Sequence, residues 1–548
     1  MLSYRKLAMR VLGRPLHTGG IDSPRPASQR AAALVLTAAL LTGAAFPAFA
    51  GTYYIEEGDI TISAGTVAGT NKVEQGGTLK SENDKDTVIT NQNKDKASSN
   101  TVTIEANGKN DKVEVTLKDV NIDTSSRNNA AVSVTGSCNT TIKLDGDNAL
   151  KSDTYRSGIA STGSLTISGG ENDSLTAQGG SGANGISSSG SLTISGGTVT
   201  ATGGNSTGIV GYGGSGIYSS SGVAISGGAV TANGGDSKDG SGGNGIYSSG
   251  GVTISSGSTV TANGGNGEDG SGGRGITSNG GVTVSGGTVN AKGGSGKNGN
   301  GGDGIRSFNP VAISGGTVNA NGGNSDYSNG GDGIRSLDHV AISGGTVKSN
   351  GGSGNLSGGN GIISYDIDLS GSLELTAKAG SPNGKALSRV GSELDLNTIK
   401  DKLDPGAKVT ATDADGKVIQ QVSIPRPVEP EEPSSSSDGG SATPSAPASF
   451  LPGLTVTDKD GQRISYTSTQ SGNTLTVCVG RFTASLRASL AALRQLRAEG
   501  IETITFQTIL CSTTLSVDEL LAMGGEDAEV VLTHHIRSST LTVGGKAV

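Results

Sequence analysis

Apolar and polar residues alternate over short runs in the middle of the chain, and the runs come in sets of three. The segment GIYSSSGVAISGGAVTANGGDSKDGSGGN, residues 216–244, contains one such set. Successive side chains of a strand point to opposite faces, so the pattern predicts three short strands separated by glycine turns. Their predicted inward residues are Ile217, Ser219, Val223, Ile225, Val230 and Ala232, and Tyr218, Ala224 and Thr231 are predicted to point outward.

The set repeats with a period of about 29 residues. Gly-Ile dipeptides recur 27 to 31 residues apart, at Gly158, Gly185, Gly216, Gly245, Gly275, Gly304, Gly333 and Gly361. Three strands per repeat of this length predict an all-β parallel β-helix solenoid. A β-propeller is disfavoured because its blades need roughly 40 residues and four strands. Residues 252–260, VTISSGSTV, carry one extra residue, which we interpret as a bulge.

The rest of the chain divides by composition. Residues 51–156 read as the N-terminal cap and irregular coils, 157–375 as the regular Gly-rich repeats, and 376–424 as the C-terminal cap. The Gly/Ser/Asn/Asp segments between coils, such as 233–244, are expected to project as loops. Residues 425–450 are rich in proline and serine and predict a linker.

Beyond the linker the pattern changes, and residues 451–548 predict a small α+β or α/β domain of unknown role. We expect a helix within 484–500 that ends at Gly500, and strands in ETITFQTIL and AEVVLTHH. The predicted apolar face of this helix comprises Leu486, Leu490, Leu493 and Leu496.

The N-terminus predicts export. Basic residues precede the apolar run at 31–46, and Ala48-Phe49-Ala50 supplies small residues at the positions that a signal peptidase reads. Residues 1–50 are therefore predicted to be a signal peptide, and an uncleaved membrane anchor is the alternative. We expect a secreted, extracellular and monomeric protein, or a cell-surface-associated one, with no membrane span after cleavage.

The net charge limits the classes of ligand that we expect, and the cysteine count limits the possible disulfides. Removal of residues 1–50 would leave 35 Lys+Arg against 48 Asp+Glu, a formal charge of −13, which disfavours nucleic acid and anionic lipid. Three cysteines do not make a disulfide framework; Cys138 stands alone, and Cys478 and Cys511 could pair.

Residues 117–377 carry phrases that point to a known family. These are IKLDGDNALKS at 142–152, GSLTISGGENDSLTAQGG at 163–180, and the repeated GI-x-S…V-x-I-S-G-G-T-V-x-A-x-G-G. In them the chain resembles secreted clostridial-type carbohydrate-binding β-helix proteins. The resemblance implies a pectate-lyase-like right-handed β-helix that binds plant-type polysaccharide, with calcium bound in some members.

The variable residue of GI-x-S is expected to face outward once per coil and so to form a ladder. Its members include Tyr218, Tyr247, Arg306 and Arg335, our candidate glycan-binding residues. Tyrosine stacks on sugar faces, and arginine pairs with carboxylates such as those of uronates. The alternative is an ordinary β-surface on which Asp303 and Asp332 pair with the arginines.

No cofactor is required by this pattern, and calcium is a candidate ligand. Asp303 and Asp332, with Asn184, Asn244 and Asn360, recur just before Gly-Ile and offer oxygen ligands. A turn ladder of Asn and Asp is the alternative. The pair His534-His535 does not predict a shared metal, because adjacent strand residues point oppositely. The GxGxxG matches at 240–245 and 270–275 lead into strands, which excludes a dinucleotide site.

These observations predict a non-catalytic, secreted polysaccharide-binding protein, with acidic plant-type glycans as candidate ligands. An adhesin for host or bacterial partners is the main alternative. Polysaccharide lyases share the fold, but we find no cluster of acids with a basic Arg or Lys. Thr198/Thr200 and Thr259/Thr261 also match the flat Thr-x-Thr pairs of ice-binding solenoids.

Overall fold

The computed structural model describes two compact units, which divide in the sequence between residues 429 and 430. Within the first unit the described residues are 51–107, 112–137, 139–206 and 211–425. Within the second they are 454–458, 462–464, 466–471, 473–479, 481, 483–508, 512–523, 528–535, 539–544 and 546–547. The predicted signal peptide, nearly all of the predicted linker, Cys138 and Cys511 lie outside the described residues.

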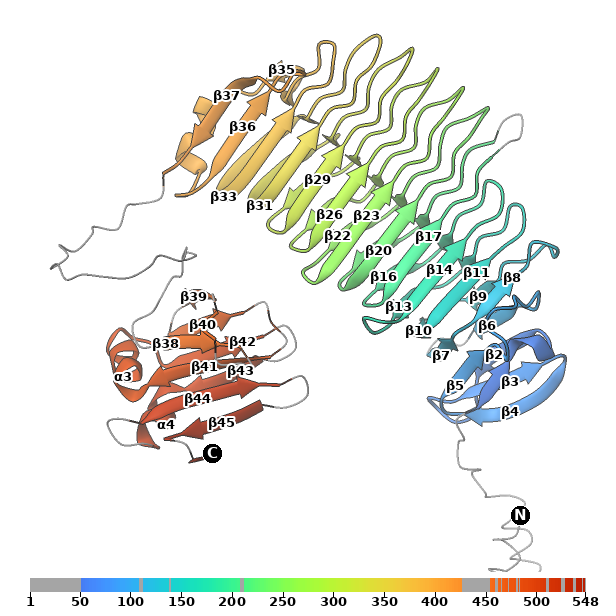
Figure 1. Cartoon of the computed structure of the whole chain (residues 1–548), viewed down its shortest axis with the longest axis horizontal. Coiled ribbons are helices and arrows are strands. Elements are labelled where there is room, and N and C mark those ends of the chain that lie inside the picture. The colour runs from blue at the N-terminus through green and yellow to red at the C-terminus, as the bar shows by residue number, and fades with distance from the viewer. Residues whose placement is uncertain are drawn as a thin grey trace, which may run out of the picture. The chain divides into compact units, whose positions relative to one another are not determined.

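The first unit is a β-solenoid of about 13 parallel stacked turns with about 29 residues per turn, which confirms the predicted fold (Figure 1). Each regular turn contributes three strands. The first strands pair from coil to coil in a 15-stranded sheet, and the second and third strands pair in a 22-stranded sheet. The first strands are β6 (Val102–Ala106), β9 (Val132–Gly136), β12 (Ile159–Ser161), β15 (Ile186–Ser188), β18 (Ile217–Ser219), β21 (Ile246–Ser248), β24 (Ile276–Ser278), β27 (Ile305–Ser307), β30 (Ile334–Ser336) and β32 (Ile362–Ser364).

The second and third strands follow at each turn. The second strands are β7 (Val113–Lys118), β10 (Thr140–Asp145), β13 (Leu165–Ser168), β16 (Ser191–Ile194), β19 (Gly222–Ile225), β22 (Gly251–Ile254), β25 (Val282–Val284) and β28 (Val311–Ile313). The third strands are β8 (Asn121–Asp123), β11 (Asp147–Lys151), β14 (Ser174–Gln178), β17 (Thr198–Thr202), β20 (Gly228–Asn233), β23 (Ser258–Asn263), β26 (Thr288–Lys292) and β29 (Thr317–Asn321). In two later turns they continue as single strands, β31 (His339–Asn350) and β33 (Asp366–Lys378).

The core is a stack of identical apolar positions. Ile217, Val223 and Ile225 are buried, whereas Tyr218 and Ala224 between them are partly exposed, as the alternation predicts. Ile217 pairs in register with Ile186 on one side and with Ile246 on the other. Burial of each such side chain contributes about 1.5–3 kcal/mol relative to exposure, so the stack is the main stabilising element.

The extra residue of 252–260 lies in a turn and not in a strand bulge. Ile254 still pairs with Val284, and Ser258 with Gly228, without a register shift. The added residue is taken up between β22 and β23, where Gly257 has a φ of 82°. The prediction of a bulge is therefore wrong. The extra residue lies in a glycine turn, which accommodates it without disturbing the hydrogen bonds between strands.

The loops between the third strand of one coil and the first strand of the next project from one side of the solenoid (Figure 1). We call them the glycine loops. Their two sides pack backbone against backbone: Gly243 N–H donates to Gly235 O, and Gly265 N–H donates to Gly243 O, both at 2.8 Å. The glycine runs are therefore a packed, hydrogen-bonded layer that continues from coil to coil.

Both ends of the solenoid are closed by antiparallel strands. At the start, β2 (Ile60–Ala64), β3 (Asn71–Gln75) and β4 (Thr78–Asp84) pair antiparallel, beside β1 (Thr52–Tyr54), β5 (Thr87–Thr90) and the 3₁₀ helix η1 (Ile55–Glu57). At the end, β34 (Leu387–Arg389) pairs antiparallel with β35 (Ser392–Glu393), and β36 (Lys408–Thr412) with β37 (Val418–Ser423), beside η2 (Leu396–Lys402). Such caps protect edge strands from pairing with other chains.

The second unit is a small α+β domain with two sheets. The five-stranded antiparallel sheet comprises β38 (Leu454–Thr457), β41 (Ala484–Ser489), β44 (Glu529–His534), β45 (Ser539–Val543) and β46 (Lys546–Ala547). The four-stranded sheet comprises β39 (Thr467–Ser471), β40 (Thr474–Cys478), β42 (Thr503–Gln507) and β43 (Ser512–Ser516). Two helices, α3 (Leu490–Ala498) and α4 (Val517–Ala522), complete the described part of the domain. No helix of the described residues is long and apolar enough to cross a membrane.

The helix predicted within 484–500 is shorter than its leucine pattern suggested. Leu486 lies on strand β41, where it pairs with Val456 and Leu532, and the prediction that it shares a helical face was wrong. The physical reason is local: burial alternates along Ala484–Ser489, and the Ser489 hydroxyl then caps α3 by accepting the Ala492 N–H at 3.2 Å. Gly500, with a φ of 91°, follows the helix end as expected.

Candidate functional site

The variable GI-x-S residues form a continuous row along the solenoid, in which Thr277 is buried. Parallel pairing places the following residues in register on successive coils: Ala160, Ser187, Tyr218, Tyr247, Thr277, Arg306, Arg335 and Ile363. The four predicted glycan-binding residues are therefore members of one row. We define the outer strip as three adjoining parts of the surface. They are this row, the row formed by the residue two positions further along each coil, and the side of the glycine loops next to them.

Aromatic and arginine side chains are concentrated on the outer strip. Residues 157–375 contain three arginines, Arg274, Arg306 and Arg335, and all three lie there on consecutive coils. Of the six aromatic residues in the same range, only Tyr327 lies elsewhere, in a glycine loop. The five on the strip are Tyr212, Tyr218, Tyr247, Phe308 and Tyr365.

The two ladder tyrosines stack on each other. The rings of Tyr218 and Tyr247 are 5.3 Å apart between centroids and inclined by only 3°. The ring faces that stack on each other are closed to a ligand. A sugar could therefore contact only the outer faces and the edges of the two rings. Their hydroxyl groups lie 3.4 Å from the Ser220 hydroxyl and the Asn279 amide, respectively.

A groove of about 440 Å³ runs beside this tyrosine pair. Besides Tyr218 and Tyr247 it is lined by Tyr212, Asn244 and Arg274, with serines and glycine backbone between them. Tyr212 is 67% exposed and has a ring face available to a ligand. Aromatic faces with hydroxyl, amide and guanidinium groups around them suit a sugar, whose rings have apolar faces and polar edges.

Three guanidinium groups share two buried carboxylates further along the strip. Arg274 Nε and Arg306 Nη1 lie 3.3 and 3.6 Å from Asp303 Oδ2. Arg335 Nη1 lies 3.1 Å from Asp332 Oδ2. The side chains of Arg306 and Arg335 are 21% and 37% exposed, so each guanidinium still reaches solvent. Their Nε atoms are buried without a hydrogen-bond partner.

The two carboxylates are also held by the backbone. Asp303 Oδ1 accepts the Asp332 N–H at 3.0 Å, and Asp332 Oδ1 accepts the N–H and the side-chain amide of Asn360. Asn184 and Asn244 accept backbone N–H groups of the next coil in the same way. Burial, reinforced by the neighbouring Asp303 carboxylate, raises the pKa of Asp332 above its usual range.

The predicted calcium ligands thus form a turn ladder whose oxygens have partners within the protein. Among the described residues, no group of three or more His, Cys, Asp or Glu side chains could hold a metal ion. Calcium binding stays a prediction to be tested in solution.

A row of apolar side chains borders the arginines. The residue after each first strand is polar in earlier coils, at Ser220, Ser249 and Asn279, and becomes apolar at Phe308, Leu337, Tyr365 and Val390. The guanidinium carbon of Arg306 lies 5.3 Å from the centre of the Phe308 ring. Phe308 is 46% exposed and Tyr365 67% exposed, so both present ring surface to solvent.

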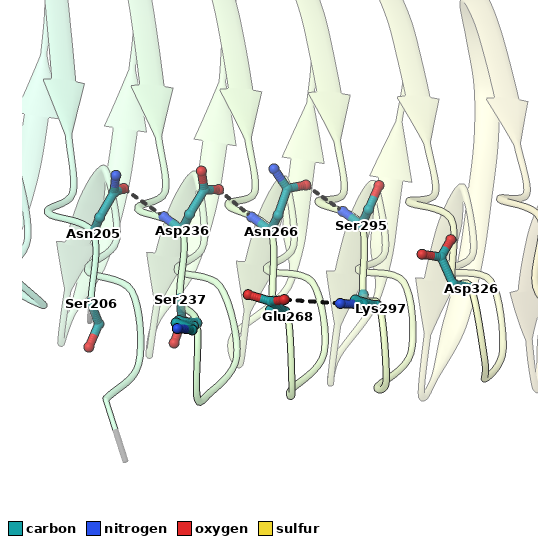
Figure 2. A pocket seen from close by; sticks show the side chains of 12 residues that line it. Asn205, Ser206, Asp236, Ser237, Asn266, Glu268, Ser295, Lys297 and Asp326 are labelled. Atoms are coloured by element: carbon teal, nitrogen blue, oxygen red, sulfur yellow. Dashed lines mark hydrogen bonds and ion pairs between the residues drawn. The ribbon is translucent and has the colours of Figure 1, made fainter. Parts of the chain in front are cut away.

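A second groove, of about 450 Å³, lies among the glycine loops (Figure 2). One row of side chains links successive coils: Asn205, Asp236 and Asn266 each accept the next coil's backbone N–H, at 2.6–2.9 Å. In a second row Glu268 pairs with Lys297 at 3.0 Å. Because these side chains already bind the backbone of the next coil or, for Glu268 and Lys297, each other, and because the lining has no aromatic residue, we favour the outer strip as the site.

Two other predicted features also have structural explanations. The segments 240–245 and 270–275 lead into strands β21 and β24, which excludes the dinucleotide loop. His534 is buried and His535 is exposed, so the two rings do point oppositely. Thr198/Thr200 and Thr259/Thr261 lie on β17 and β23, in the 22-stranded sheet and off the outer strip.

Sequence reasoning missed four members of the site: Tyr212, Arg274, Phe308 and Tyr365. Arg274 and Phe308 could have been found by counting from Gly-Ile, because Arg274 occupies the position of Asp303 in its own coil, and Phe308 that of Ser249. Tyr212 lies four residues before Gly216, the position of Ser241 and Ser271 in their own coils, so counting back from Gly-Ile could also have found it.

No family model, curated protein or solved structure matches the chain. The fold by itself defines the class, a parallel β-solenoid protein with a separate small α+β domain. Its function must therefore be argued from the outer strip.

Proposed function

We propose that the protein is a secreted, non-catalytic polysaccharide-binding protein whose ligand lies along the outer strip. The observation that carries the proposal is the concentration of five of six aromatic residues and all three arginines of residues 157–375 on this one strip. From Tyr218 to Ile363 the strip crosses six coils, about 24 Å at roughly 4.8 Å per coil, which suits an extended chain more than a compact ligand.

The chemistry of the strip supports a sugar. Tyr212 offers an exposed ring face, and the stacked pair of Tyr218 and Tyr247 offers ring edges and hydroxyl groups beside the same groove. The resemblance of residues 117–377 to secreted carbohydrate-binding β-helix proteins agrees with this choice. The described residues place no cluster of acids beside a free base on the strip, because Asp303 and Asp332 are bonded to arginine and backbone groups.

The test is binding of the full mature chain to a panel of neutral and acidic polysaccharides, with calcium and with a chelator. Tyr212→Ala should weaken binding about tenfold, the effect of losing one aromatic contact. Tyr327→Ala is the matched control, because it removes an aromatic residue that is also well exposed, at 61%, but lies off the strip.

The proposal would be rejected if the protein bound no polysaccharide of the panel. It would also be rejected if Tyr212→Ala and Tyr327→Ala weakened binding equally. Adhesion to cells without binding to any isolated glycan would instead favour the adhesin alternative. Release of unsaturated or reducing ends from a bound polysaccharide would overturn the non-catalytic part of the proposal.

A further inference from the structure

We propose that cleavage between Ala50 and Gly51 gives Gly51 an α-ammonium group that forms an ion pair with the buried carboxylate of Asp84. This ion pair stabilises the N-terminal cap of the solenoid, so that removal of the predicted signal peptide is coupled to folding. The proposal rests on the predicted cleavage site and is independent of the ligand of the outer strip.

Gly51 is held inside the first coil of the solenoid. Its carbonyl oxygen accepts the Val88 N–H at 2.9 Å, and β1, which begins at the next residue, pairs in parallel with β5. The backbone nitrogen of Gly51 lies 2.9 Å from Asp84 Oδ1. The nitrogen atom that cleavage would release is therefore already placed against a carboxylate.

Asp84 is a buried carboxylate that has no cation as its partner in the described residues. It is fully buried at the end of β4, and no lysine, arginine or histidine that the structure describes forms an ion pair with it. Thr87 Oγ1 donates to Asp84 Oδ2 at 3.1 Å. Burial, reinforced by the contact with Asp84, raises the pKa of Tyr53 above its usual value, so the phenol stays protonated and donates to the carboxylate. Because all these donors are neutral, the buried charge is still uncompensated, which is costly.

The packing around position 51 accepts only glycine. A Cβ added to Gly51 would overlap the Tyr53 hydroxyl and would lie 2.6 Å from Asp84 Oδ2. The backbone nitrogen can approach the carboxylate because no side chain stands between them. The residues Ala48-Phe49-Ala50 place the predicted cleavage directly before this glycine. The cleavage signal and the shape of the site thus point independently to the same residue.

Cleavage changes the charge of the Gly51 nitrogen. Hydrolysis of the Ala50–Gly51 peptide bond by a signal peptidase consumes one water molecule. Ala50 keeps the new carboxylate, and Gly51 keeps the amine, which binds a proton below about pH 8. A neutral amide donor thereby becomes a cation, and its hydrogen bond to Asp84 becomes an ion pair. The uncleaved chain has the hydrogen bond without the charge.

The ion pair connects the strands of the cap. Asp84 ends β4, and Thr87, which donates to it, begins β5. Thr87 Oγ1 also accepts the side-chain amide of Asn71, on β3, at 2.8 Å. Gly51 adds the start of β1. One carboxylate therefore links four strands at the end of the stack, where the cap must protect the first coil.

The first experiment measures how fast the Gly51 amine of the full mature chain, residues 51–548, reacts with an acylating reagent at pH 7. We expect a rate on the order of tenfold lower than in a peptide with the same first residues, because raising the pKa of an amine by one unit lowers its reactive fraction tenfold. Equal rates would overturn the inference. The measurement needs no substitution, so a variant that fails to fold cannot obscure it.

The second experiment separates the charge from the hydrogen bond. Acetylation of the Gly51 amine, or retention of residues 48–50, removes the ammonium group and should lower the thermal unfolding midpoint of the solenoid by several degrees. In Asp84→Asn the same block should have almost no effect, because no carboxylate is left to pair. Asp86→Asn is the matched control: Asp86 is exposed two residues further on, so blocking the amine should still lower the midpoint in this variant.

Sequencing of the N-terminus of the secreted protein tests the cleavage itself, and we expect Gly51 as the first residue. Any other first residue would contradict the proposal, as would a block that lowers the midpoint equally in Asp84→Asn. Both results would leave the proposed function standing. Conversely, failure to bind any polysaccharide would leave this ion pair untouched.

Discussion

Individual glycines determine whether the loops beside the site can pack. The backbone of Gly273 approaches that of Gly243 in the preceding coil so closely that a Cβ added to Gly273 would overlap the Gly243 carbonyl oxygen. Both positions belong to a hydrogen-bonded chain in which Gly273 N–H donates to Gly265 O at 2.8 Å. The side chain is excluded here by a neighbouring backbone that cannot move aside without breaking this chain.

We therefore predict that Gly273→Ala destabilises the solenoid by about 1–3 kcal/mol, the usual cost of overpacking. Gly251→Ala is the matched control, because an added Cβ there would lie 3.6 Å from its nearest neighbour, Gly280 O, in ordinary contact. Chemical denaturation of the two variants measures the difference. Equal free energies of unfolding would contradict the close backbone packing of the loops.

His534 is a second residue whose surroundings predict a measurable effect. Its ring lies between the two sheets of the C-terminal domain, with Nε2 2.9 Å from the Thr513 hydroxyl and Nδ1 3.2 Å from the Thr508 hydroxyl. Burial lowers the pKa of His534 below its usual value. The unfolded chain then binds the proton more readily than the folded domain does.

It follows that His534 contributes stability that is present above its unfolded pKa, about 6.5, and is lost as the pH falls below that value. Thermal unfolding of this domain should therefore occur at a lower temperature at pH 5 than at pH 7.5. His534→Gln, which cannot titrate, should reduce the difference, and His535→Gln on the exposed side should not. A pH response unchanged in His534→Gln would refute this origin.

At the scale of the element, alternation with glycine turns was enough to predict the strands of the solenoid. It assigned Ile217, Val223 and Val230 to the core because parallel stacking buries the same face in every coil. It failed at Leu486, where apolar residues at positions 486, 490 and 493 satisfy a helical period although 484–489 also alternate as a strand. The strand ends and the helix begins at the Ser489 cap. Residues 484–489 form a strand because they pair with β44, a contact that the local sequence does not reveal.

The same limit applies to the candidate site. The ladder could be predicted from the spacing of Gly-Ile alone, because the register of a solenoid follows from its period. The mutual stacking of Tyr218 and Tyr247 and the sharing of Asp303 by two arginines could not, since both depend on side-chain directions. The position of Tyr212 could be counted from Gly-Ile, but the direction of its ring could not.

At the scale of the whole molecule, the solenoid is a one-dimensional stack in which each coil contacts its neighbours. Ile276, Ile305 and Ile334 occupy one position in three successive coils, and each pairs with the next. Removing one whole coil should therefore bring equivalent residues together again.

We predict that deletion of residues 305–333, which joins Gly304 to Ile334, leaves a folded solenoid with its Ile276 now paired to Ile334. The deleted coil carries Arg306 and Phe308, two members of the outer strip, so the shortened protein should also bind polysaccharides less tightly. Circular dichroism and size-exclusion chromatography measure the folding. Deletion of residues 305–318, about half a coil, is the control and should aggregate, because it places outward residues against the core and leaves strands unpaired. If both deletions unfold the protein, the coils are not independent units, and stability depends on longer-range cooperation along the stack.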